Sequence, residues 1–129
     1  MELSEASAHL KGVSFPNYFP KYSCRRILTM EWVDGLPLDR FAKGGVSQED
    51  RDRVGQALWD FYDFQIHSLR LFHADPHPGN FLVRDGGLVV LDFGCTKKID
   101  SGFYERHFRF LDGRLLDDPA GLDAALTDL

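Results

Sequence analysis

The eight residues from His73 to Asn80 constrain the fold of this chain more than any other stretch. They read His-Ala-Asp-Pro-His-Pro-Gly-Asn. Pro76 and Pro78 fix two φ angles and remove two backbone donors, so the stretch is predicted to be a rigid loop and not a helix. Gly79 allows the backbone to bend just before Asn80.

A β-hairpin is predicted to follow this loop, with two strands and a turn at Phe81–Val83, Leu88–Leu91 and Asp85–Gly87. The hairpin returns the chain, so Asp92 is expected beside Asn80 and close to Asp75. Two carboxylates and an amide oxygen are hard ligands, which suit Mg²⁺ better than a soft metal. The loop and hairpin therefore predict a small magnesium-binding constellation.

Protein kinases place the same residue types at the same spacing, in an H-R-D-x-x-x-x-N loop followed by D-F-G. Here Ala74 stands where the kinase motif has arginine. The loop His73–Asn80, the run Leu91-Asp-Phe-Gly94 and the upstream segment Arg26–Gly35 resemble the UbiB or AarF family of atypical kinase-like proteins. Matching segments run from about Glu5 to about Ile99.

The resemblance implies an α+β, protein-kinase-like fold, present as one partial domain over residues 1–129. Residues 1–33 would be the end of the N-terminal lobe and the hinge. Residues 34–129 would be the core of a mainly helical C-terminal lobe, whose hairpin carries the D-F-G motif. A complete kinase-like fold needs about twice this length.

The resemblance also implies ATP and Mg²⁺ as ligands and gives each site residue a role. Asp75 would face the phosphoryl acceptor or water, and Asn80 and Asp92 would hold Mg²⁺. The hinge backbone that meets the adenine would come from Met30, Glu31, Trp32 and Val33. The residues expected to support the site without reacting are His73, His77, Gly79 and Gly94.

The remaining pattern predicts mostly helices. Ser47 is expected to cap a long helix with Asp50 at the capping-box position. Trp59, Tyr62 and Phe64 widen its apolar stripe, which predicts a helix buried on nearly all sides. Other elements are expected as a helix over 2–11, a strand ending at Tyr22, a strand over 26–31, a short helix or turn over 36–43, and helices over 102–116, capped by Ser101, and 119–126.

Charge and composition exclude some classes of function. A net charge of −5 and a pI near 5.4 argue against a nucleic-acid partner. No signal peptide is evident, and no apolar run approaches the roughly 18 residues of a membrane span. The chain is expected to be cytoplasmic, with Cys24 and Cys95 as reduced thiols. The resemblance adds a link to ubiquinone or other isoprenoid lipids and to a membrane face.

Three alternatives stay open at this point. The alternation of His73, Asp75 and His77 could bind Zn²⁺ or Fe²⁺. Aminoglycoside and choline kinases have a similar H-G-D-x-H-P-G-N loop, so a small-molecule phosphotransferase is possible. A non-catalytic nucleotide-binding module is the third, because no phosphate loop and no kinase lysine with its partner glutamate can be recognised. The family's alanine-rich loop and K-x-G-Q motif would lie upstream of Met1, so weak or absent ATPase is expected from the chain alone.

Overall fold

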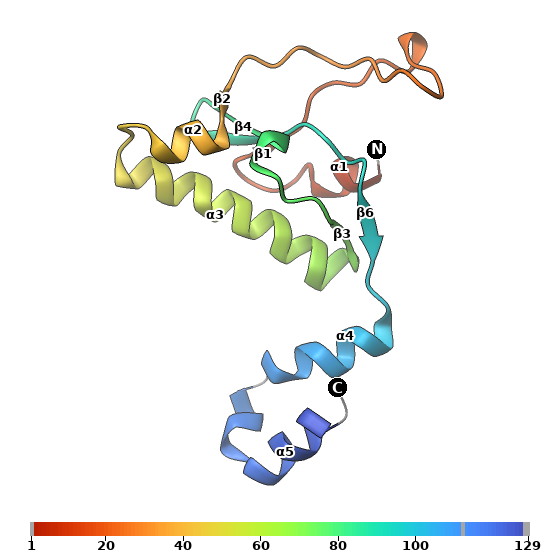
Figure 1. The fold of residues 1–129 in the computed structure, drawn as a ribbon, viewed down its shortest axis with the longest axis vertical. Coiled ribbons are helices and arrows are strands. Elements are labelled where there is room, and N and C mark those ends of the chain that lie inside the picture. Colours follow the sequence, from red (N-terminus) through yellow and green to blue (C-terminus); the bar gives the residue numbers. More distant parts are fainter. Residues whose placement is uncertain (1, 112, 128–129) are drawn as a thin grey trace. The chain divides into compact units, whose positions relative to one another are not determined.

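The computed structural model describes residues 2–111 and 113–127. The chain divides into two compact units, one up to Lys97 and one from Lys98 onward, and each is described by itself. The fold is a mixture of helices and small sheets, as expected for part of a kinase-like domain (Figure 1).

A four-stranded sheet in the order β1-β5-β4-β2 forms the centre of the first unit. Its strands are β1 Val13–Ser14, β2 Leu36–Pro37, β4 Phe81–Arg84 and β5 Gly87–Val90. β4 and β5 make the predicted antiparallel hairpin. Asp85 and Gly86 both have positive φ, 53° and 74°, at the turn, which is the backbone of a type I′ hairpin. The hairpin prediction is confirmed, whereas the parallel pairing of β1 with β5 was not expected.

Three helices accompany this sheet: α1 Glu2–Ser7, α2 Leu38–Lys43 and α3 Gln48–Phe64. Ser47 caps α3 as predicted, because its side chain accepts a hydrogen bond from the Asp50 N–H at 3.1 Å. The helix continues through one π-helical turn, Gln65–Leu69. Arg70 then ends it in the left-handed region, with φ of 54°.

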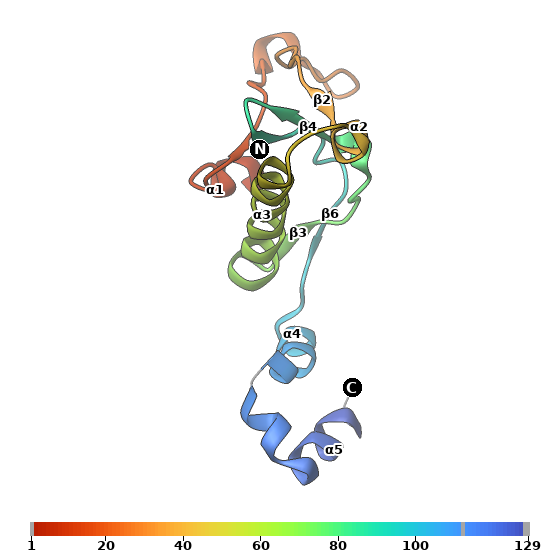
Figure 2. The same ribbon diagram turned by 90° about the vertical axis from the view of Figure 1, so that its left-hand side faces the viewer.

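One face of α3 packs on the sheet and makes the core (Figure 1, Figure 2). Val54, Ala57 and Phe61 are its buried residues, and they meet the inward side chains of β4 and β5. The prediction that α3 is buried nearly all round was wrong, since Trp59 is 69% exposed. The aromatic residues raise the helix's apolar content without placing every side of it in the core.

The N-terminal segment differs most from expectation. The first helix stops at Ser7 and not at residue 11. The predicted strands before the hinge are absent as strands, and only isolated bridges form, between Tyr18 and Met30 and between Cys24 and Ile27. The Ser23 hydroxyl accepts from the Thr29 N–H at 2.9 Å, so a side chain takes a backbone donor that a ladder would use.

The second unit is helical. α4 Ser101–Phe108 is followed by two 3₁₀ segments, Arg109–Leu111 and Gly113–Asp117, and by α5 Pro119–Thr127. The expected helix over 102–116 is therefore wrong in length, and residue 112 within it lies outside the described part. Asp100 caps α4 in place of Ser101, with its carboxylate accepting from Phe103 N–H at 3.0 Å. The last helix, starting at Pro119, is confirmed.

Candidate functional site

The stretch His73–Asn80 contains no α-helix, as predicted, but it ends in a short 3₁₀ helix, Pro78–Asn80, which was not expected. The loop is fastened at both ends. The loop begins at His73, the last residue of β3 Leu71–His73. This strand pairs with β6 Thr96–Lys98. Ala74 N–H donates to the Cys95 carbonyl at 2.8 Å. At the far end, Leu91 N–H donates to the Asn80 carbonyl at 2.9 Å, which extends the hairpin ladder into the loop. The loop is thus tied to the segments on both sides of the D-F-G motif.

Two of the three predicted site residues, Asp75 and Asn80, are in direct contact. The Asn80 side-chain amide donates to the Asp75 carboxylate at 3.2 Å and to the Asp75 carbonyl at 3.1 Å. Both bonds come from the amide nitrogen, so the amide oxygen is left as the ligand atom of Asn80. Asp92 follows directly after Leu91, the backbone partner of Asn80.

Asp92 has one oxygen engaged and one available. Its Oδ1 accepts from the Gly94 N–H at 2.7 Å, and its Oδ2 takes no part in that bond. One carboxylate and one amide oxygen fit Mg²⁺, which commonly takes one or two protein ligands and completes its shell with water and phosphate oxygens. Within residues 2–111 and 113–127, no three His, Cys, Asp or Glu side chains gather as a metal-ligand set.

The two histidines of the loop sit in different surroundings. His73 is 1% exposed, and its N–H donates to Gln65 Oε1 at 2.7 Å. Its ring stands edge-on to the rings of Phe81 and Phe93. His77 is exposed, and its Nδ1 accepts from the Gly79 N–H at 3.1 Å. This difference in burial gives the zinc or iron alternative no support.

A hollow opens beside Asp92 and reveals a residue that the sequence did not indicate. It has a volume of about 260 Å³ and is lined by Tyr18, Leu28, Leu91, Asp92, Phe93 and Gly94. Tyr18 and Leu28 also line a neighbouring hollow of about 290 Å³ with Pro20, Ser23 and Cys24. Burial and then the charge of Asp92 raise the pKa of the Tyr18 hydroxyl. An aromatic residue between two prolines carried no signal for this position.

The expected hinge residues do not line these two hollows. Met30 is 39% exposed, Trp32 is 90% exposed and Val33 is buried. Glu31 is held by Asn17, whose side-chain amide donates to the Glu31 carboxylate at 2.8 Å. The segment is therefore ordered against residues 17 and 18, next to Tyr18.

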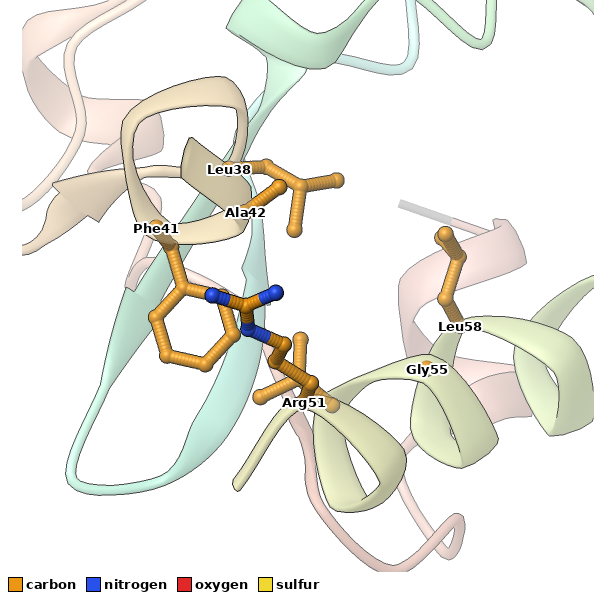
Figure 3. Close-up of a pocket in the computed structure, with 7 residues that line it drawn as sticks. Leu38, Phe41, Ala42, Arg51, Gly55 and Leu58 are labelled. Carbon is orange, nitrogen blue, oxygen red and sulfur yellow. The ribbon is translucent and has the colours of Figure 1, made fainter. Parts of the chain in front are cut away.

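An apolar groove that shares no lining residue with these hollows lies between α2 and α3 (Figure 3). It has a volume of about 400 Å³ and is lined by Leu38, Phe41, Ala42, Arg51, Val54, Gly55 and Leu58. Arg51 is the only charged residue of the lining, and Figure 3 shows its side chain reaching beside Phe41. Its guanidinium donates to the Gly44 carbonyl at 2.8 Å.

Comparison with known proteins identifies the family. The family model of the ABC1 atypical kinase-like domain matches residues 1–123. The chain belongs to the ABC1 atypical kinase-like family. The resemblance of the loop and the D-F-G segment to UbiB or AarF proteins is thereby confirmed, since curated relatives carry ABC1-type kinase and AarF names.

Relatives of this ABC1 domain are found in plants and in Dictyostelium. "Protein ACTIVITY OF BC1 COMPLEX KINASE 8, chloroplastic" of Arabidopsis thaliana is 34% identical over 123 residues, which cover 93% of this chain and 16% of that protein. "Probable serine/threonine-protein kinase abkB" of Dictyostelium discoideum is 36% identical over 100 residues, or 68% of this chain and 14% of that protein. The chain thus spans about a sixth or less of the length of these relatives.

A solved structure supports the kinase-like fold of this ABC1 domain. The Mycobacterium tuberculosis protein Rv3197, determined as a complex with erythromycin, aligns with a TM-score of 0.62 and 28% identity. The alignment covers 74% of this chain and 24% of that one. None of the helices in the described part is long and apolar enough to cross a membrane.

Proposed function

We propose that this ABC1 domain binds ATP with Mg²⁺ and contributes the loop and D-F-G half of a phosphoryl-transfer or ATPase site. The observation that carries the proposal is the orientation of the Asn80 amide. Its nitrogen is turned toward Asp75, which leaves its oxygen as the ligand atom, and the Asn80 backbone carbonyl is bonded to Leu91, the residue before Asp92.

Each of the three residues then has a distinct task. Asp75, exposed and held by Asn80, would orient the acceptor hydroxyl or water and take its proton. Asn80 and Asp92 would hold the metal against the nucleotide phosphates. The bound Mg²⁺ would offset negative charge that develops on the phosphoryl oxygens. Gly94 keeps Asp92 in place through its N–H.

The nucleotide base would lie toward the hollow lined by Tyr18 and Leu28, and the hinge backbone of Met30–Val33 would meet it from outside the present lining of that hollow. Under this proposal residues 1–33 end the N-terminal lobe and residues 34–129 form the core of the C-terminal lobe. The family match favours this function over the small-molecule phosphotransferases considered from the sequence. It leaves the acceptor open between a small molecule, a protein and water.

Turnover and lipid linkage are further parts of the proposal. Because the chain spans a small share of its relatives' length, we expect the 129 residues alone to bind nucleotide more readily than they hydrolyse it. The link to ubiquinone or another isoprenoid lipid, and to a membrane face, rests on the family resemblance.

Calorimetric titration of Mg·ATP into the chain tests this function. We expect saturable binding that EDTA abolishes, and at least tenfold weaker binding by Asp92→Asn. Asp85→Asn is the matched control, because Asp85 lies at the opposite end of the same hairpin and asparagine tolerates its positive φ. Binding that is absent, or equally strong without a divalent metal, would refute the proposal.

Macrolide binding is a second candidate function, favoured by the groove between α2 and α3. The solved relative was determined with erythromycin, and the apolar groove of about 400 Å³ is in the size range of small-molecule sites. Erythromycin titration into the wild type, Leu58→Glu and the exposed neighbour Trp59→Glu checks this candidate. Loss of binding in the first variant alone supports the groove, and competition with Mg·ATP would place the macrolide at the nucleotide site.

A further inference from the structure

Tyr62 connects the buried part of α3 to the loop that carries Asp75. Its hydroxyl lies 3.4 Å from Nδ1 of His73, and its side chain is only partly buried. The apolar pattern of the helix indicated nothing more than packing for this residue. The contact instead joins two polar groups across the boundary between the core and the loop.

The imidazole of His73 has few partners besides Tyr62. The backbone N–H of His73 is held by Gln65, and the Gln65 side-chain amide donates to the Phe61 carbonyl at 2.8 Å. Gln65 and Phe61 are fully buried, so this frame is fixed in the core. Among the described residues, Nε2 of His73 has no hydrogen-bond partner. The hydroxyl of Tyr62 is therefore the polar contact of the ring.

The unpartnered nitrogen decides which tautomer fits. If Tyr62 donated to Nδ1, the ring proton would sit on Nε2, and a buried N–H would be unpaired. If Nδ1 carries the proton, it donates to Tyr62 and leaves only a lone pair on Nε2. Orphaned N–H groups are rarer in protein interiors than under-satisfied acceptors. In the second arrangement the Tyr62 hydroxyl is the acceptor, so its own proton takes no part in the bond to His73.

Asp75 lies two residues after His73 on the same loop. Burial and, second, the nearby charge of Asp75 raise the pKa of Tyr62 to about 12. The hydroxyl thus stays protonated at neutral pH and remains a neutral acceptor for His73 Nδ1. The side-chain amide of Asn80 already holds the Asp75 carboxylate.

We propose that Tyr62 is a positioning residue, which accepts a hydrogen bond from His73 Nδ1 and so fixes the start of the loop that carries Asp75. The role rests on the proposed function, because it orients Asp75 for the acceptor. Asn80 holds the Asp75 carboxylate directly, and Tyr62 holds the loop two residues earlier, at His73. No covalent step involves the phenol.

The first test is the tautomer of His73, read from the ring nitrogen shifts of ¹⁵N-histidine-labelled chain. We expect the proton on Nδ1 in the wild type and a shift toward the Nε2 form in Tyr62→Phe, which keeps the ring. Tyr22→Phe is the control, because Tyr22 is 66% exposed. A wild-type proton on Nε2, or identical shifts in Tyr62→Phe, would overturn the inference whether or not nucleotide binds.

The second test separates positioning from structure by comparing ground-state and transition-state ligands. Tyr62→Phe is expected to bind Mg·ATP within twofold of the wild type and Mg·ADP with aluminium fluoride about tenfold more weakly, because orientation of the acceptor matters only in the second complex. Equal losses for both ligands, or no loss for either, would overturn the role. Failure of the wild type to bind Mg·ATP would refute the proposed function instead, and the tautomer then decides the inference.

Discussion

Replacing Gln65 by methionine tests how the loop His73–Asn80 is held to the core. Gln65 is 0% exposed and bridges two backbone groups with its side chain. Its Oε1 accepts from His73 N–H at 2.7 Å, and its Nε2 donates to the Phe61 carbonyl at 2.8 Å. Methionine has nearly the same length and fills the same space, so the variant removes the hydrogen bonds without opening a large cavity.

Most of the expected loss of stability comes from one donor that Gln65→Met leaves unpaired, the His73 N–H. Phe61 keeps a partner, since its carbonyl still accepts from the backbone N–H of residue 65. The His73 N–H has no such substitute, and an unpaired buried donor costs about 1–3 kcal/mol. We therefore expect Gln65→Met to lower the free energy of unfolding by about 2 kcal/mol. For a chain of 129 residues, which lies between the two size classes with known scaling, that corresponds to a fall in Tm of roughly 4–16 °C.

Chemical denaturation followed by circular dichroism measures the change, with Gln56→Met as the matched control. Gln56 lies on the same helix, and its amide donates to the exposed carboxylate of Asp60 at 2.7 Å. Such a pair at i,i+4 contributes about 0.2–0.5 kcal/mol. If the two variants lose the same stability, the buried bridge at Gln65 does not hold the loop as described.

Three further predictions follow from local structure. Ser47→Ala removes the cap of α3 and should cost about 1 kcal/mol in urea unfolding. Gly86→Val places a branched side chain at φ of 74° in the hairpin turn and should cost about 1–3 kcal/mol, more than the same change at the open position Gly45. The pKa of Tyr62 is raised from 10.0 to about 12, so its stabilising contribution is full below pH 10 and is lost as the pH rises through 12. The free energy of unfolding should therefore depend less on pH in Tyr62→Phe at high pH. The absorbance titration of that variant at 295 nm should also lose one tyrosinate transition at high pH.

The loop and the hairpin could be predicted because their causes are local. Pro76 and Pro78 exclude an α-helix and allow only the 3₁₀ turn Pro78–Asn80. Asp85-Gly86 supplies the two positive φ angles of the hairpin turn. Ser47 likewise caps α3 through a bond to a residue three positions away. These features need no knowledge of the rest of the chain.

The parts that the sequence missed depend on distant residues. β1 pairs with β5 across more than seventy positions, and two residues in a short strand give no periodicity to detect. Tyr18 reaches Leu91 and the charge of Asp92 only because the N-terminal segment folds back. Tyr62 looked like any aromatic of an apolar stripe, and its polar partner His73 became visible only with the end of α3 in place.

The most direct measurement of the central claim, that Asn80 and Asp92 hold the metal of a bound nucleotide, replaces Mg²⁺ with paramagnetic Mn²⁺. Titration of substoichiometric Mn·ATP into ¹⁵N-labelled chain should broaden the amide signals flanking Asn80 and Asp92 most strongly. The effect should decrease along the hairpin toward Gly86 and disappear in Asp92→Asn. Broadening centred elsewhere, or unchanged in that variant, would contradict the account.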